Sequence, residues 1–482
     1  LTGRVRPVSY VSSPVKVRRS VDREKFLRVE ESRFRLPGVR ASVDPVRSYP
    51  FDERYCHALG HLGEVNEQEL ARDSTLKPLD YVGRDGIEAR YESRLRGRDG
   101  YEYVEVDASG HEIGTLREKR PVPAVPGQDL HLTLDPDLQQ LAWQLTSPWA
   151  SAAVVCLDPR SGDVLCLMSR PGFDPNLFTG PIPRATWDSL AGDRSRPFFN
   201  RTVSAAYPPG SAFKPVVAQA ALELGAAEPS TRFEPCRGQY VYGTQPFKCW
   251  SVHGSLDLPG AIAHSCNVYF YQLGLRLGLD SLVTFAGRTP LGSPTGIDLP
   301  AEAAGNIPTR EWLDRRYGRG EWRAGVLLNL AIGQGEILAT PLQLAVLYSA
   351  IANNGRWFPP RLVGGIDSAG RALRLPPPRA RALNWNRRHL NTVRLALERV
   401  VEYGTARSAR LGEVTIAGKT GTAENPGGAD HAWFVGYAPA EQPEIVVAVL
   451  VENGGHGGAV AAPIARQLIR RWFDIPEAVT KR

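Results

Sequence analysis

Three stretches of the sequence place a hydroxyl side chain close to a lysine or an amide. In the first, Ser211 precedes Lys214 by three residues, directly after the Pro-Pro-Gly of residues 208–210. Pro215 is tolerated in a first helical turn, so we expect a helix that starts at Ser211 and carries both side chains on one face. A neutral lysine activates a serine by accepting its proton, and burial lowers the lysine pKa toward that state. Alone, the pair is more typical of a capping serine and a surface lysine.

The second stretch places Ser265 and Asn267 on either side of Cys266. It follows an apolar helical segment and precedes the apolar residues 268–271. Polar side chains between such runs are partly buried and need partners. Ser265 is suited to relaying a proton and Asn267 to holding a substrate carbonyl, whereas ordinary helix capping is the alternative.

The third stretch is Lys419, Thr420, Gly421 and Thr422, which we expect at the end of a strand over residues 414–418. Gly421 would let another backbone approach an edge strand, an arrangement that binds an extended peptide by strand addition. Lys419 would attract a carboxylate, and Thr422 would supply a backbone N–H to an oxyanion hole. A hairpin rich in Thr and Gly is the alternative.

The composition adds weight to the two lysines of these stretches. The chain has 482 residues and a net charge of +7, and eight of its 58 basic residues are lysines. A lysine in an arginine-dominated chain indicates that an amine is required, because an arginine does not give up its proton near neutral pH. The basic residues are scattered rather than gathered, so the charge predicts no nucleic-acid partner.

The length predicts two or three domains, and alternating and helical patterns outline them. Asp135 and Pro136 open a predicted helix that runs to about residue 145, after a predicted strand over 130–134. Residues 1–36 are expected to be extended or accessory, residues 100–106 to form a strand that enters a turn at 107–110, and residues 121–127 to form a hinge.

The rest of the chain predicts one α+β domain over residues 146–482, in which an antiparallel sheet is flanked by helices, preceded by an N-terminal domain over residues 1–145. Helical patterns fill residues 211–352, and predicted strands cover residues 152–157, 164–168, 414–419, 432–437 and 444–452, with a closing helix over 459–473. The longest strongly apolar run, residues 445–451, is too short for a membrane span. The sequence starts at Leu1, so we expect an anchor or signal segment to precede it.

The three stretches, in this order, resemble the S-x-x-K, S-D-N and K-T-G motifs of penicillin-binding proteins and class A β-lactamases, with Cys266 at the middle position of the second. From about residue 36 onward the chain is similar to the class B, elongation-type penicillin-binding protein 2 group. Further stretches that carry this resemblance are residues 60–66, 80–86, 95–100, 169–176, 296–300, 332–336 and 339–343.

The resemblance implies a peptidoglycan D,D-transpeptidase domain on a non-catalytic pedestal, which crosslinks stem peptides during cell-wall elongation and is inhibited by β-lactams. By the same resemblance, Ser211 forms the acyl-enzyme with the penultimate D-Ala, and Lys214 is the general base. Ser265 and Asn267 form the second motif, and Lys419, Thr420 and Thr422 the strand that binds the peptide and its carboxylate. No cofactor is implied for catalysis.

The resemblance also implies partners and a location. The partners are a stem peptide ending in D-Ala-D-Ala, β-lactam antibiotics and a SEDS-family glycan polymerase in the membrane, which the pedestal would contact. The location is the inner membrane, with this part of the chain in the periplasm.

Three of the six cysteines gather with a histidine around the second motif. Cys236, Cys249, His253 and Cys266 have types and spacing that suit a closed, structural zinc site, and some members of the resembled subfamily hold a zinc in this segment. A Cys236–Cys249 disulfide and free thiols are the alternatives. His264 has no matching role.

Two rival functions remain open at this point. A β-lactamase shares the three motifs and adds a deacylating carboxylate, and Glu302 and Asn306 have the Glu-x-x-x-Asn spacing of a class A enzyme. A non-enzymatic penicillin sensor or scaffold is the second rival. The pedestal and the similarity of residues 296–302 to a transpeptidase loop favour the transpeptidase.

Overall fold

The computed structural model describes residues 17–18, 21–36, 38–39, 41, 45–106, 112–116, 118–368 and 371–476. Contacts divide the chain into two units, of which unit 1 comprises Leu1–Asp52, Leu59–Asp129 and Asp174–Trp187. Unit 2 comprises Glu53–Ala58, Leu130–Phe173 and Asp188–Arg482, and it contains all three motifs. Among the described residues, no helix has both the length and the apolar character needed to cross a bilayer.

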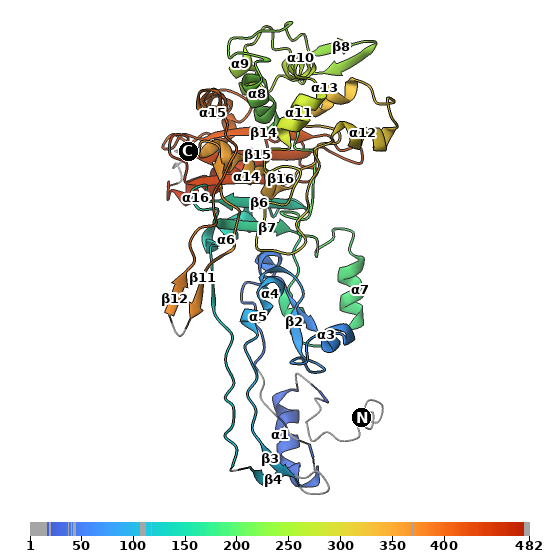
Figure 1. Ribbon diagram of the computed structural model, residues 1–482, viewed down its shortest axis with the longest axis vertical. Helices are drawn as coiled ribbons and strands as arrows, with labels where there is room; N and C mark the ends of the chain where they lie inside the picture. The colour runs from blue at the N-terminus through green and yellow to red at the C-terminus, as the bar shows by residue number, and fades with distance from the viewer. Residues whose placement is uncertain are drawn as a thin grey trace, which may run out of the picture. The chain divides into compact units, whose positions relative to one another are not determined.

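Unit 2 is built on a five-stranded sheet in which every neighbouring pair is antiparallel. Its strands, which Figure 1 shows stacked in this order, are β14 (Ala417–Ala423), β15 (His431–Ala438), β16 (Ile445–Val451), β6 (Ala152–Leu157) and β7 (Val164–Arg170). The first two strands of the domain therefore join the last three, which confirms the antiparallel sheet predicted from the sequence. β14, which carries the third motif, lies at one edge.

Helices cover both faces of this sheet. Successive side chains of a strand point to opposite faces, and every residue of β6 and of β16 is buried. The helices α14 (Pro341–Ala352) and α16 (Ala461–Trp472) both contact β16, and α6 (Pro136–Leu145) contacts β7 and α16. As predicted, Asp135 caps α6, accepting a hydrogen bond from the N–H of Leu138 at 2.9 Å, and Pro136 is its first residue.

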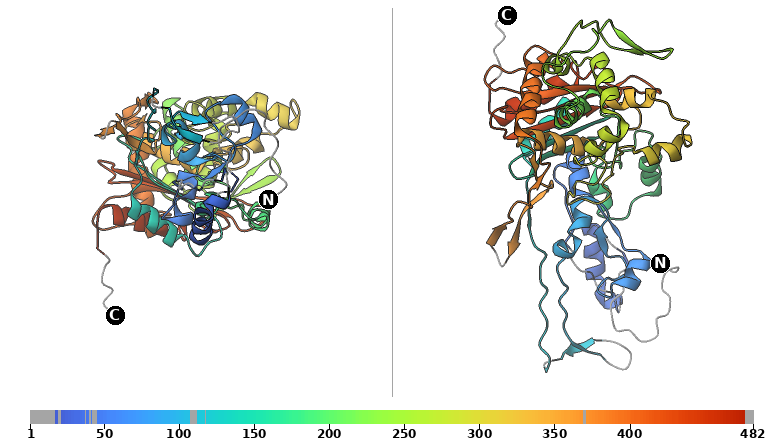
Figure 2. Two further views of the ribbon diagram at one scale, coloured as in Figure 1. Left: turned by 90° about the horizontal axis from the view of Figure 1, so that it is seen from below. Right: turned by 45° about the horizontal axis from the view of Figure 1, so that its top comes forward.

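A group of short helices lies beyond the β14 edge, as both Figure 1 and Figure 2 show. It comprises α8 (Lys214–Glu223), α9 (Leu258–Ala263), α10 (Asn267–Leu277), α11 (Leu279–Ala286) and α13 (Gly325–Ala331), together with the longer α15 (Arg387–Glu402). The 3-10 turn η4 (Gly210–Phe213) contacts β14 and leads into α8. This segment of the chain also contains a hairpin that the helical pattern did not predict, formed by β8 (Gln239–Tyr242) and β9 (Gln245–Lys248).

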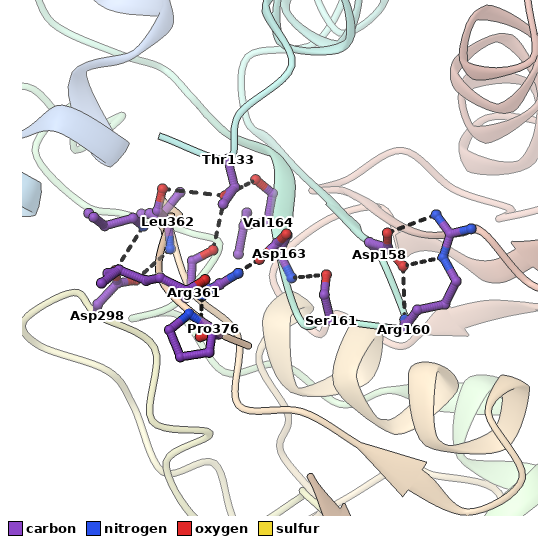
Figure 3. A network of polar contacts seen from close by, with 12 residues as sticks. Thr133, Asp158, Arg160, Ser161, Asp163, Val164, Asp298, Arg361, Leu362 and Pro376 are labelled. Atoms are coloured by element: carbon purple, nitrogen blue, oxygen red, sulfur yellow. Dashed lines mark hydrogen bonds and ion pairs between the residues drawn. The ribbon is translucent and has the colours of Figure 1, made fainter. Parts of the chain in front are cut away.

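Unit 2 also has a small second sheet of three strands, β12 (Arg371–Arg374), β11 (Val363–Ser368) and β5 (Leu130–Leu132). Arg361, just before β11, links it to the turn between β6 and β7. Its guanidinium contacts the Asp163 carboxylate at 2.5 Å and the carbonyl of Pro376 at 2.7 Å (Figure 3). The Asp298 carboxylate accepts the N–H groups of Leu362 and Val363 at 2.6 and 3.0 Å. Stretch 296–300 therefore supports the framework of the domain.

Unit 1 pairs two of the stretches that carried the sequence resemblance. β1 (Leu62–Glu64) lies antiparallel to β2 (Tyr81–Gly83), and Arg84 forms an ion pair with Glu69 of α3 (Glu67–Arg72). The turn predicted at 107–110 lies outside the described residues. The remaining elements of unit 1 are α1 (Arg23–Glu31), η1 (Arg33–Arg35), α4 (Gly86–Arg90), α5 (Glu92–Leu95), β3 (Val104–Val106), β4 (Glu112–Thr115) and η3 (Pro175–Phe178).

The other elements lie wholly or mainly in unit 2. They are η2 (Asp52–Arg54), α2 (Cys56–Leu59), α7 (Arg184–Gly192), α12 (Arg310–Tyr317), β10 (Arg356–Trp357), β13 (Arg381–Ala382) and η5 (Arg407–Ala409).

Candidate active site

Ser211 lies in a 3-10 turn rather than at the first residue of an α-helix. The turn η4 precedes α8, which starts at Lys214, so the predicted helix start is wrong by three residues. In a 3-10 turn, side chains three residues apart lie above one another, and the expected alignment of Ser211 with Lys214 therefore does not need an α-helix. Pro215 occupies the first turn of α8, as predicted.

Contacts on several sides hold the segment around Ser211. The Trp433 indole donates to the carbonyl of Pro208 at 3.1 Å, and the Tyr348 hydroxyl donates to the carbonyl of Ala212 at 3.0 Å. The N–H of Gly210 donates to a carbonyl of the loop after α13, that of Gly333, at 2.8 Å. The backbone next to Ser211 is thus fixed by residues far away in the sequence.

Gly210 brings the first motif against the third. Its φ of 52° lies in the left-handed region, and a Cβ added there would lie 2.6 Å from the carbonyl oxygen of Thr422. A Cβ on Gly421 would likewise lie 2.8 Å from the carbonyl oxygen of Pro209. Glycines at both positions therefore permit direct contact between the Ser211 segment and the edge strand β14.

Lys214 is fully buried and bonded to the second motif. Its ammonium donates to the Ser265 carbonyl at 2.8 Å, to the Ser265 hydroxyl at 3.3 Å and to Oδ1 of Asn267 at 2.6 Å. It also lies 5.3 Å from the centre of the Phe270 ring. Burial lowers the pKa of Lys214 to about 8, because desolvation disfavours the charged amine.

The second motif spans a bend between two helices. Ser265 has a φ of 55°, in the left-handed region that side chains other than glycine seldom adopt, and it follows α9, while Asn267 starts α10. The N-cap residue of α10 is Cys266, whose side chain makes no cap hydrogen bond. Since the Ser265 and Asn267 side chains both face Lys214, helix capping does not account for them.

The third motif lies within β14, not at its end as we expected, because the strand runs on to Ala423. Lys419 is fully buried, and its ammonium donates to the Thr420 carbonyl at 3.2 Å. Desolvation and the charge of Lys214 lower the pKa of Lys419 well below its ordinary value. The hydroxyls of Thr420 and Thr405 are 2.7 Å apart.

All three motifs therefore meet at one edge of the sheet. Lys214 contacts the second motif directly, and the segment before Ser211 contacts the third. The lysines are buried, whereas Ser211, Asn267 and Thr422 keep part of their surface exposed to solvent. This division suits a site in which the exposed groups meet a ligand while the buried amines control protons and charge.

An ion-pair network that sequence reasoning missed holds the chain before Ser211. Oε1 of Glu452 accepts hydrogen bonds from the Tyr207 hydroxyl at 2.5 Å and from the Arg201 guanidinium at 2.8 Å. The Arg201 side chain is 5% exposed and that of Glu452 is 20% exposed. No local pattern marks these residues, since Glu452 is 245 positions from Tyr207.

Glu302, the carboxylate of the β-lactamase alternative, is occupied within its own loop. Its Oε1 accepts from the N–H and the hydroxyl of Thr295, and its Oε2 accepts from the N–H of Gly296. The Asn306 amide donates to the carbonyl of Glu336. Both side chains thus organise loops, which argues against a deacylating pair.

The Cys/His cluster predicted from spacing forms in space. The side-chain ligand atoms of Cys236, Cys249, His253 and Cys266 all lie within 4.8 Å of one another. Nδ1 of His253 is 3.6 Å from Sγ of Cys236 and 3.5 Å from Sγ of Cys249. The cysteines are free in this structure, and the N–H of Asn267 donates to Sγ of Cys249 at 3.3 Å.

Two family models match this chain. The transpeptidase domain of penicillin-binding proteins matches residues 152–470, and the penicillin-binding protein dimerisation domain matches residues 4–132. The first match contains the whole of the site described above.

Similar proteins and structures agree with these matches. The peptidoglycan D,D-transpeptidase MrdA of Acinetobacter baumannii is 34% identical over 95% of this chain and 70% of its own length. The crystal structure of Pseudomonas aeruginosa PBP2 in complex with WCK 5153 has a TM-score of 0.77 at 36% identity, covering 91% of this chain and 92% of that one. A complex between PBP2 and MreC from Helicobacter pylori has a TM-score of 0.82 at 30% identity, covering 94% and 84%.

Proposed function

This chain belongs to the penicillin-binding protein transpeptidases and is a peptidoglycan D,D-transpeptidase, and we propose that the residues gathered beside β14 carry out its reaction. Family membership confirms the resemblance found in the sequence and the predicted α+β transpeptidase domain. The individual residue roles are our proposal. The observation that carries it is the fully buried Lys214 ammonium, bonded to Ser265 and Asn267 beside the Ser211 turn.

The first half of the reaction forms an acyl-enzyme. The Ser211 oxygen bonds to the carbonyl carbon of the penultimate D-Ala while its proton passes to the neutral Lys214 amine. The C–N bond to the terminal D-Ala then breaks, and the leaving amine takes a proton from Lys214. Ser265, whose hydroxyl is 3.3 Å from the Lys214 nitrogen, relays that proton. Asn267 holds the substrate carbonyl.

In the second half, the amine of another stem peptide forms a C–N bond to the acyl carbon, the ester bond to Ser211 breaks, and the amine's proton passes through Lys214 to the Ser211 oxygen, which completes the crosslink. The N–H groups of Ser211 and Thr422 form the oxyanion hole, and each contributes about 10²–10³ in rate. Lys419 and Thr420 bind the carboxylate of the terminal D-Ala, and Gly421 lets the peptide lie along β14.

Intact mass measurement after penicillin treatment tests these roles. The wild-type protein should gain one penicilloyl group at Ser211 that persists for many times the labelling period, and Ser211→Ala should gain none. Rapid steady turnover of penicillin would instead indicate a β-lactamase. A Ser211→Ala variant that still supports cell growth and shape would favour a sensor or scaffold. Labelling at another residue would refute the assignment of Ser211.

We further propose that Cys236, Cys249, His253 and Cys266 hold a structural zinc ion. A tetrahedral site with ordinary Zn–S and Zn–N bonds places sulfur and nitrogen about 3.5 Å apart, close to the 3.5 and 3.6 Å between His253 and two of the sulfurs. A bound zinc would brace Cys266 and thereby its neighbours in the second motif.

Metal analysis together with thermal unfolding tests the zinc proposal. The purified protein should contain about one zinc per chain, and a chelator should lower its Tm. A content below about a tenth of an equivalent would contradict the proposal. Thiol titration then separates the alternatives, because a Cys236–Cys249 disulfide removes two reactive thiols and free cysteines remove none.

We propose that the chain consists of a pedestal domain over residues 1–145 and a transpeptidase domain over residues 146–482. The two family models fall on either side of that boundary, at 4–132 and 152–470. We propose that the protein acts outside the cytoplasm, anchored to the inner membrane, with a SEDS-family glycan polymerase as partner of the pedestal. Co-purification of the two proteins from membranes is the expected result, and its failure with both proteins folded would count against this partner.

A further inference from the structure

Gln334 is a buried amide to which the proposed reaction gives no role. It lies in the loop after α13, between Gly333 and Gly335, and is 9% exposed. Its Nε2 donates to the carbonyl of Thr422 at 2.9 Å, and its Oε1 accepts from the N–H of Glu424 at 3.4 Å. The side chain therefore bonds two backbone groups of the third-motif strand and its continuation.

These two bonds follow the pattern of a parallel β-strand. In a parallel ladder, one residue donates to the carbonyl of a residue on its neighbour and accepts from the N–H two positions further along. The Gln334 amide does the same with Thr422 and Glu424. Because β14 is the outermost strand of its sheet, its outer row of backbone groups has no strand of that sheet beside it. The amide takes the place of one residue of an added strand.

The direction of the Thr422 carbonyl also fixes the direction of its N–H. The N–H and C=O of one residue in a regular strand point to the same edge. Since the carbonyl faces Gln334, the Thr422 N–H faces the outer edge as well, where a Cβ on Gly210 would lie 3.2 Å from the Thr422 nitrogen. The proposed oxyanion hole needs this N–H to point out of the sheet toward the Ser211 turn.

The same loop also bonds the other side of the proposed oxyanion hole. The carbonyl of Gly333 accepts the N–H of Gly210, the residue before Ser211, at 2.8 Å. A Cβ on Gly333 would lie 2.1 Å from the carbonyl oxygen of Gly210, so only glycine permits this approach. Two adjacent residues, Gly333 and Gln334, thus hold the backbone on both sides of the hole.

We infer that Gln334 is a positioning residue for the oxyanion hole, acting through the peptide groups of Thr422 and Glu424. The inference rests on the proposed function, because it takes the N–H groups of Ser211 and Thr422 as the donors to the oxyanion. A donor helps the transition state only when it is already aimed at the position where charge develops. The Gln334 amide orients the Thr422 N–H in this way without touching the substrate.

The test compares Gln334→Met and Gln334→Glu with the wild type and with Gln272→Met. Gln272 is a matched control on α10, whose amide bonds the backbone of Glu234 and Val268 instead of β14. Acylation by a labelled penicillin is followed across concentrations, which separates the rate constant at saturation from the half-saturating concentration. Gln334→Met should lower the rate constant about tenfold and change the half-saturating concentration less than about twofold. Gln272→Met should match the wild type.

A pH series on Gln334→Glu distinguishes positioning from general damage to the fold. The introduced carboxylate has no donor for the Thr422 carbonyl, whereas its protonated form regains one and still accepts from the Glu424 N–H. The ratio of wild-type to variant rate constants should therefore fall toward one as the pH is lowered. This readout decides the matter even where Gln334→Met does not fold.

Three outcomes would overturn the inference. They are a saturating rate constant within about twofold of wild type in both Gln334 variants, a change confined to the half-saturating concentration, and a ratio for Gln334→Glu that does not change with pH. Each is read on protein whose wild type is labelled at Ser211. An unlabelled wild type would instead refute the proposed function itself, so the two failures are distinguishable.

Discussion

The two sides of the catalytic site are built from different kinds of backbone. On the helical side, the first and second motifs occupy a 3-10 turn and a bend, with left-handed residues at Gly210 and Ser265. On the sheet side, the third motif occupies the regular seven-residue strand β14. Each side contributes one fully buried lysine, Lys214 or Lys419.

The two lysines are equally buried but have different surroundings. Lys214 donates to oxygens of Ser265 and Asn267, and its pKa is lowered to about 8. Lys419 donates to the carbonyl of Thr420, and burial, together with the charge of Lys214, lowers its pKa well below the ordinary value.

The different surroundings of the two lysines indicate how one site separates proton transfer from the binding of a carboxylate. An amine that titrates near neutral pH and already has acceptors in place is suited to moving a proton. An amine whose charged form is disfavoured gains most from an anion brought beside it, which suits the binding of a carboxylate. The irregular backbone of the helical side places the proton-transfer groups, while the regular strand offers its edge to a peptide.

The largest effect is expected from Lys214→Met, which would remove the proposed base from the helical side. Methionine has nearly the same length but accepts no proton, so acylation by a labelled penicillin should slow by about 10³–10⁴-fold. Circular dichroism should show an unchanged fold. Acylation within about tenfold of wild type would mean that another group is the base and that the comparison assigns the proton-transfer task wrongly.

The pH dependence of acylation tests the same side without a substitution. Lys214 is the base only when neutral, so the acylation rate should rise with pH until about 8 and level off above it. Below that pKa the neutral fraction falls tenfold per pH unit, and the expected loss between pH 8 and pH 6 is about 50-fold. Stopped-flow acylation across this range measures it, and a flat profile would contradict the assignment.

Lys419→Met should have a smaller effect of a different kind. Loss of a charge-assisted hydrogen bond to the substrate carboxylate should raise the half-saturating concentration of penicillin about 10- to 100-fold. The rate constant at saturation should change less than in Lys214→Met. If the rate constant falls as far and the half-saturating concentration stays constant, the two lysines do not divide the tasks.

The sequence predicts the sheet side better than the helical side. Strands β6 and β16 and helix α6 lie where alternation, apolar runs and the Asp135–Pro136 start place them. These signals are local, since each depends on side-chain period or on a cap a few residues away. The boundary at β14 is less accurate, because pairing with β15 extends the strand through Thr422 to Ala423.

The helical side depends on contacts that no local pattern contains. The three motifs can be found from their residue types, yet the 3-10 turn at Ser211 follows from its packing against β14 and Gly333. Gln334 contacts Thr422 across 88 positions of sequence, so its role is visible only in the fold. In unit 1, Arg23–Glu31 is helical where we expected extended or accessory structure, because the Asp22 cap and a Glu24–Arg28 pair outweigh its weak apolar pattern.

The smallest effect is expected where the two sides are joined, at Glu452 after β16. Gln is isosteric and still accepts a hydrogen bond, but Glu452→Gln removes the charge that faces the buried Arg201 and the Tyr207 hydroxyl. The free energy of unfolding in urea should fall by about 1–3 kcal/mol, and acylation should slow about three- to tenfold because the chain before Ser211 loosens. Glu444→Gln is the matched control, because Glu444 lies just before the other end of β16. Its side chain is 42% exposed, and its carboxylate lies 3.6 Å from the Arg160 guanidinium. Its effect on stability should stay below about 0.5 kcal/mol. Equal effects of the two variants would show that Glu452 acts as an ordinary surface charge. The helical side would then keep its geometry without the contacts of Glu452 with Arg201 and Tyr207.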